Sequence, residues 1–101
     1  MLAEVRTYTL VPGGAADFLA IYRELGLPVQ RKHLGEPAGC YRSEVGELNR
    51  VTFIWRFENA ADRERRRQQL LADKDFLAYF QDVRGLLVRQ QSELLNEVDL
   101  A

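Results

Sequence analysis

The segment that most constrains the fold is residues 48–58, which alternate between large apolar side chains and smaller or polar ones. In an extended strand, side chains two positions apart share a face. One face therefore carries Val51, Phe53, Trp55 and Phe57, and the other carries Thr52 and Ile54. A half-exposed antiparallel strand normally has one clearly polar face. Here one face is strongly apolar and the other is partly so. This pattern predicts that other parts of the protein or a second subunit pack against both faces of the strand.

Two arrangements satisfy this pattern. In the first, the aromatic face packs beneath helices and the face of Thr52 and Ile54 is exposed. In the second, which we expect, two sheets stack face to face across a two-fold axis, and a pocket is enclosed between sheet and helices. Homodimers are the commonest soluble oligomers, and such a contact uses the same surface of both subunits.

The first half of the chain predicts a strand, a helix and a second strand. Residues 3–11 alternate and end at Pro12, where the breaker Pro-Gly-Gly begins. From Ala15 the apolar period becomes helical, and Gly26 and Pro28 are expected to end this helix, with one further helical turn at 29–35. A strand is predicted at 38–45. Only two residues, 46 and 47, separate it from strand 48–58, which favours a type II′ hairpin.

The second half predicts a helix, a further helix and a last strand. Asn59 is a plausible N-cap for a helix through about Ala72. Asp73 then starts another helix that Gly85 closes, and a strand follows at 86–95. The order strand, helix, strand, strand, helix, strand is the split βαβ arrangement, with a four-stranded antiparallel sheet and helices on one face. We expect an α+β fold forming one domain over 1–101.

Composition excludes several functional classes. The 14 Lys and Arg residues against 15 Asp and Glu give a net charge of −1, which provides no field to attract nucleic acid or an anionic membrane. Cys40 and His33 are the only residues of their types, so no disulfide within the chain and no Cys- or His-based metal site is expected. No signal peptide is evident. We expect a cytoplasmic protein without metal or bound cofactor.

Five residues are candidates for ligand binding. Glu4, Arg6 and Tyr8 share one face of the first strand, where an arginine with a tyrosine hydroxyl could bind a carboxylate or hold an enolate-like oxygen. The structural alternative is an ion pair between Arg6 and Glu4 beside a packed tyrosine. Asn49 and Trp55 also share a face and could position a flat aromatic compound, although an asparagine beside a hairpin commonly bonds to its own backbone.

His33 is the fifth candidate, as a general base at the mouth of the pocket. The alternative is a solvated histidine in a basic run, because no nearby carboxylate is spaced to orient the ring. The arginines at 63, 65, 66 and 67 spread around their helix and predict a solvated face or ion pairs at a subunit rim. Cys40 is expected to pack as a small apolar residue.

Several segments together resemble the NIPSNAP family, within the wider group of dimeric α/β barrels. They are residues 4–13, 31–33, 39–41, 46–51 followed by Trp55, and 65–67 leading into Leu70. The resemblance implies a ferredoxin-like fold and a homodimer. At Phe53 the chain departs from the family motif, which has a histidine two residues before the tryptophan. If that histidine does chemistry in relatives, this chain should lack that chemistry or perform it differently.

Three functions remain open at this point. The first is a small homodimeric NIPSNAP-like protein with a small-molecule pocket. The second is a cofactor-free monooxygenase or isomerase acting on a small aromatic or polyketide-like compound. The third is an assembly module without small-molecule chemistry. A pocket holding several polar groups favours the first two.

Overall fold

The computed structural model describes all 101 residues as one α+β domain. Its elements, in chain order, are β1 (Leu2–Leu10), α1 (Gly14–Ile21), a π-helical turn (Tyr22–Gly26), α2 (Leu27–Leu34), β2 (Gly39–Arg42), β3 (Arg50–Phe57), α3 (Ala60–Leu71), α4 (Lys74–Val83), a 3₁₀ turn (Arg84–Leu86) and β4 (Leu87–Asn96). The predicted order of strands and helical connections is therefore confirmed.

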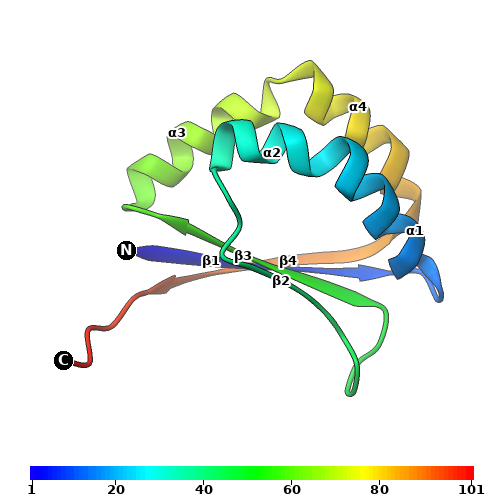
Figure 1. Ribbon diagram of the computed structural model, residues 1–101, viewed down its shortest axis with the longest axis horizontal. Coiled ribbons are helices and arrows are strands. Elements are labelled where there is room, and N and C mark those ends of the chain that lie inside the picture. Colours follow the sequence, from blue (N-terminus) through cyan, green and yellow to red (C-terminus); the bar gives the residue numbers. More distant parts are fainter.

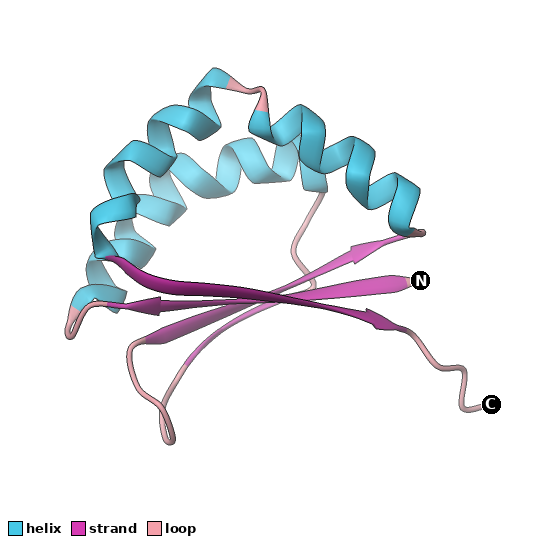
Figure 2. Ribbon diagram, turned by 180° about the vertical axis from the view of Figure 1, so that it is seen from behind, coloured by secondary structure: helices cyan, strands magenta, loops and turns pink.

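The four strands form one antiparallel sheet in the order β2-β3-β1-β4, with β1 in the centre between β3 and β4. All helices lie on one side of the sheet, and no element covers the other side (Figure 1). The view from behind shows the same two layers (Figure 2). The split βαβ arrangement with helices on one face is confirmed.

The aromatic face of β3 packs beneath the helices. Its four large side chains are between 0% and 2% exposed, and they form the centre of the core with residues of β1, α1 and α3. The Phe53 ring lies 4.7 Å from Tyr22 and 6.4 Å from Trp55, between ring centroids. The helices therefore bury the aromatic face of this strand, as in the first of the two arrangements.

The sequence predicted that the first helix ends at Gly26 and Pro28, and this prediction is wrong. The chain stays helical from Gly14 to Leu34, with a π-helical turn in the middle. Pro28 lies in the first turn of α2, where the missing N–H costs no helical hydrogen bond. A Cβ atom at Gly26 would lie 2.7 Å from the Tyr79 ring, so this glycine serves the close approach of α4 and does not end a helix.

The connection between β2 and β3 is also longer than predicted. The strands end at Arg42 and begin again at Arg50, so a loop of residues 43–49 replaces the two-residue turn. Gly46 has a positive φ of 97°, as expected for a glycine turn, but Asn49 has one too, at 60°. The Asn49 backbone oxygen accepts a hydrogen bond from the Leu10 N–H, and its side-chain oxygen accepts one from the Gly13 N–H.

Both predicted helix caps are confirmed. The Asn59 side chain accepts a hydrogen bond from the Asp62 N–H at the start of α3, and Asp73 accepts one from the Asp75 N–H at the start of α4. These caps define where each helix begins and therefore which of its side chains face the sheet.

Candidate ligand-binding site

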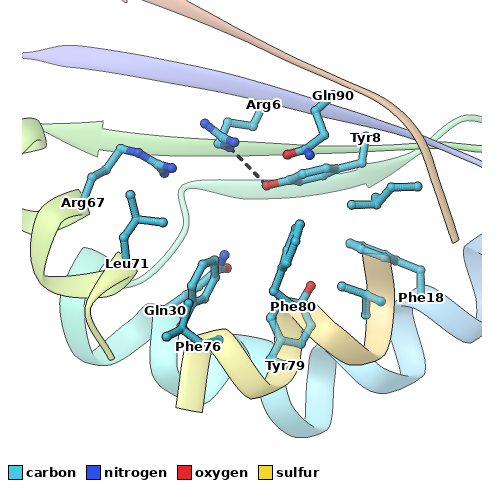
Figure 3. Close-up of a pocket in the computed structure, with 13 residues that line it drawn as sticks. Arg6, Tyr8, Phe18, Gln30, Arg67, Leu71, Phe76, Tyr79, Phe80 and Gln90 are labelled. Carbon is cyan, nitrogen blue, oxygen red and sulfur yellow. Dashed lines mark hydrogen bonds between the residues drawn. The ribbon is translucent and has the colours of Figure 1, made fainter. Parts of the chain in front are cut away.

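A cavity of about 350 Å³ lies between the sheet and the helices, which is at the small end of the usual range for ligand pockets. The close-up shows side chains of β1 and β4 along one wall and side chains of the helices along the other (Figure 3). The lining residues are Arg6, Tyr8, Phe18, Gln30, Arg67, Leu71, Phe76, Leu77, Tyr79, Phe80, Val83, Leu87 and Gln90. Most are apolar, so the cavity is an apolar space with a few polar groups.

Local periodicity explains why these side chains converge. On β1, Arg6 and Tyr8 are two residues apart and both point to the helix side, and Gln90 pairs with Tyr8 across the β1–β4 ladder. On α4, Phe76, Phe80 and Val83 follow helical spacing and form one apolar stripe toward the sheet. The cavity is thus the gap between a strand face and a helix stripe.

Glu4 is the centre of a buried charged cluster next to the cavity. The residue is 0% exposed. Its Oε1 accepts a hydrogen bond from Arg63 Nε at 3.0 Å, and its Oε2 accepts from Arg63 Nη2 at 2.9 Å, Arg6 Nη1 at 3.0 Å and Ser92 Oγ at 2.5 Å. Burial raises the pKa of Glu4, but the hydrogen bonds from Arg63, Ser92 and Arg6 outweigh it and lower the pKa from 4.5 to about 2. Glu4 therefore stays ionised and holds two arginines.

This cluster fixes Arg6 against Tyr8 at the cavity wall. Arg6 Nε donates a hydrogen bond of 3.1 Å to the Tyr8 hydroxyl oxygen (Figure 3). A hydroxyl that accepts through its oxygen keeps its own proton free to donate to another group. The predicted ion pair between Arg6 and Glu4 and the predicted pairing of Arg6 with the Tyr8 hydroxyl are thus both present in the structure.

Arg67 differs from the other arginines of α3. Arg63 contacts Glu4, and Arg65 and Arg66 contact Asp62, whereas Arg67 has no carboxylate partner. Its side chain lines the cavity at the same end as Arg6 (Figure 3). Burial and then the charge of Arg6 lower the pKa of Arg67. An arginine nevertheless remains a cation at neutral pH.

Gln30 and Tyr79 add polar groups to the helix wall. The Tyr22 hydroxyl donates a hydrogen bond of 2.6 Å to Gln30 Oε1, which leaves the amide N–H groups of Gln30 free at the cavity. Burial raises the pKa of Tyr79, so this tyrosine is protonated and neutral. None of the lining residues is an Asp, Glu or His.

Of the five candidates from the sequence, the structure places Arg6 and Tyr8 in the cavity wall. Trp55 shares the helix side of the sheet with Arg6, because it pairs with Glu4 across the β1–β3 ladder. However, Trp55 is 1% exposed, stacks on Phe53 and does not line the cavity. It belongs to the core because the helices cover β3 more closely than β4.

Asn49 is a structural residue in this arrangement. It lies at the end of the 43–49 loop, and its Oδ1 accepts a hydrogen bond of 3.2 Å from the Gly13 N–H. It therefore connects the β2–β3 loop to the turn before α1, away from the cavity. The alternative considered for Asn49 was a bond to its own backbone, and the bonding partner is instead the backbone of a distant turn.

His33 does have an orienting carboxylate, contrary to the expectation from its neighbours in sequence. Its Nε2 lies 2.7 Å from Asp73 Oδ2, and Lys32 Nζ lies 3.5 Å from the same oxygen. The hydrogen bond from His33, followed by that from the Asp75 N–H, lowers the pKa of Asp73. This pair connects the end of α2 to the start of α4 and does not line the cavity.

Three polar residues that line the cavity were not predicted from the sequence: Gln30, Arg67 and Gln90. A signal for Arg67 exists, because Arg63, Arg67 and the fully buried Leu70 are spaced by four and three residues and so share one helix face. No such signal marks Gln30. Cys40 is exposed on the edge strand β2, so it does not pack as a small apolar residue.

The His, Cys, Asp and Glu side chains do not come together in any group of three that could hold a metal ion. No helix has the length and apolar character needed to cross a bilayer.

The fold and cavity together define a ferredoxin-like α+β domain. Residues 3–101 match the NIPSNAP family model, and the chain belongs to the NIPSNAP family. It is 36% identical over 72 residues to the Protein NipSnap homolog of Dictyostelium discoideum, a match that covers 67% of this chain and 30% of that protein.

Solved structures of bacterial NIPSNAP proteins resemble the whole chain. A NIPSNAP family protein of Agrobacterium tumefaciens is 32% identical with a TM-score of 0.95, covering 100% of this chain and 91% of its own. A NIPSNAP-like domain protein of Burkholderia xenovorans is 35% identical with a TM-score of 0.94, covering 99% and 87%. An antibiotic biosynthesis monooxygenase shares the fold at 16% identity, with a TM-score of 0.67 and coverage of 98% and 100%.

Proposed function

We propose that this NIPSNAP domain binds a small organic molecule in the cavity between its sheet and helices. The observation that carries the proposal is an apolar cavity with a few donor groups that no protein acceptor takes up: the Arg67 guanidinium, the Tyr8 hydroxyl proton and the Gln30 amide N–H groups. Pockets with an apolar lining and a few placed polar groups are the usual form of ligand sites. An assembly module needs no such cavity.

A neutral aromatic probe tests this proposal. We expect 2-naphthamide to bind with a Kd below about 1 mM in isothermal titration calorimetry, because its rings are matched to the apolar lining. Gln90→Trp adds an indole on the exposed edge strand at the cavity wall and should weaken binding at least about ten-fold by filling the space.

Gln69→Trp is the matched control, since it makes the same exchange on the exposed surface of α3 outside the cavity. It should leave the affinity of 2-naphthamide unchanged. If wild type shows no heat of binding, or if both variants lower the affinity equally, the cavity is not a ligand site.

We also propose that the protein is a homodimer that uses the sheet face opposite the helices. This face carries Val5, Thr7, Thr52 and Ile54 at its centre, where the Thr7 and Thr52 hydroxyls lie 3.3 Å apart. Tyr41 extends the same face and is 61% exposed. A second copy of the chain would cover this partly apolar surface with an identical one.

Light scattering coupled to gel filtration tests the dimer at micromolar concentration. The wild type should give about twice 11.7 kDa, or a multiple of that mass. Ile54→Arg should shift the protein to monomer, because it places a charge in the middle of the contact. Ala16→Arg adds the same charge on the exposed surface of α1 and should not. A monomeric wild type would refute the proposal.

Catalysis on the bound molecule is a second candidate, favoured by the contact between Arg6 and the Tyr8 hydroxyl. Two donors next to each other could hold an enolate-like oxygen of a small aromatic or polyketide-like compound. The cavity offers no Asp, Glu or His as a base, so a proton would have to leave through Tyr8 or the compound itself. Binding is therefore the function that the geometry supports best.

A further inference from the structure

The charged groups that line the cavity are all positive. Its lining includes two arginines and no acidic residue. The nearest buried carboxylate, Glu4, is already shared by Arg6 and Arg63, so this group of three has an excess of one positive charge. Arg67 adds a second positive charge at the same end of the cavity (Figure 3).

The free hydrogen-bonding groups at that end of the cavity are donors. A guanidinium only donates, and the Tyr8 hydroxyl keeps its proton free because it accepts from Arg6. Arg67 is the one arginine of α3 without a carboxylate, although its charge lies in a partly buried place beside two other arginines. Burial and Arg6 lower its pKa, so an anion bound there would relieve a cost that the free protein carries.

We propose that the cavity takes ligands with a single carboxylate on an apolar or aromatic body, and that Arg67 is the group that anchors the carboxylate. This inference rests on the proposed function, because it names the chemical class that the same cavity selects. The planar fork of a guanidinium matches the two oxygens of a carboxylate. A single charge is expected, because Arg6 is already committed to Glu4 and Tyr8 and only Arg67 is free.

The remainder of the cavity fits the body of such a ligand. Away from Arg67 and Arg6, the walls carry Phe18 and Phe80, which offer apolar contacts (Figure 3). The ligand would lie with its carboxylate near α3 and its apolar part between β1 and α4. Its orientation follows from the position of the charge at one end.

Two probes of almost equal shape test the inference, 2-naphthoate and the neutral 2-naphthamide, both measured by isothermal titration calorimetry. The wild type should bind 2-naphthoate at least about ten-fold more tightly, as expected for a charge-assisted pair. Arg67→Gln should remove this preference, because it should weaken the binding of 2-naphthoate much more than that of 2-naphthamide. Arg67→Lys should give an intermediate affinity for 2-naphthoate, since it keeps the charge but loses the fork.

Arg65→Gln is the control for net charge, because Arg65 is exposed and bound to Asp62. It should keep the full preference for 2-naphthoate. Thermal denaturation checks that the variants fold, and Arg67→Gln should have a Tm equal to or above that of the wild type, because it removes repulsion from Arg6 and Arg63.

The outcomes separate this inference from the proposed function. If both probes bind the wild type equally, the cavity is a ligand site but does not select carboxylates, and the inference is overturned. The same holds if Arg65→Gln lowers the preference as much as Arg67→Gln does. If neither probe binds, the proposed function fails and the inference fails with it.

Discussion

Glu4→Gln should lower the free energy of unfolding at pH 7 by about 3–5 kcal/mol, the usual cost of removing one partner from a buried ion pair. The substitution keeps the shape of the side chain but leaves Arg6 and Arg63, both largely buried, without their counter-charge. Urea denaturation at one fixed protein concentration measures the change, since stability of a dimer depends on concentration. The exposed Glu44→Gln is the control and should change little.

The same variant should change how stability depends on pH. The pKa of Glu4 is lowered to about 2 in the folded protein from 4.5, so its contribution is complete above about pH 4.5 and is lost as the pH falls toward 2. Linkage puts this contribution at about 3 kcal/mol. The difference between wild type and Glu4→Gln should therefore shrink between pH 5 and pH 2. A difference that stays constant over this range would show that Glu4 is not an ionised partner of the arginines.

Trp55→Ala should also lower the free energy of unfolding by about 3–5 kcal/mol, because it opens a cavity in the core. Trp55 is 1% exposed and stacks on Phe53, so the space left by the missing indole is closed off by apolar side chains and is not readily filled by water. Chemical denaturation measures this loss. The exposed Tyr41→Ala changes an aromatic residue of the edge strand and should cost much less.

A second variant of Trp55 tests whether this residue belongs to the core or to the cavity wall. Trp55→Phe keeps an aromatic ring in the core and should leave the affinity for 2-naphthamide unchanged, because Trp55 does not line the cavity. If Trp55→Phe weakens the probe as strongly as Gln90→Trp, the tryptophan contacts the ligand and our assignment of the cavity wall is wrong.

Glu4 connects the stability of the buried charged cluster to the geometry of the cavity. Glu4 holds Arg6 in place and Arg6 contacts Tyr8, so the stability of the cluster and the geometry of the cavity depend on the same carboxylate. Glu4 does not line the cavity, so it is a positioning residue for the site.

The sequence alone determined the fold and part of the site. Alternation in 48–58 assigned the aromatic side chains to one face, and the caps Asn59 and Asp73 located two helix starts, because both signals depend only on local backbone geometry. The same two-residue spacing put Arg6 and Tyr8 together in the cavity wall. It could not show that the first helix continues past Gly26, since that depends on the approach of Tyr79 from another helix.

Only the tertiary structure decided which distant groups meet. His33 meets Asp73 forty residues later, the Asn49 side chain binds the Gly13 N–H from another loop, and Arg67 lines the same cavity as Arg6 without a carboxylate partner. Periodicity determines which side of its own element a side chain faces, whereas register and helix packing determine what lies opposite it. Strand spacing therefore revealed Arg6 and Tyr8, while Trp55 became a core residue and Arg67 a cavity residue only when the helices were placed over the sheet.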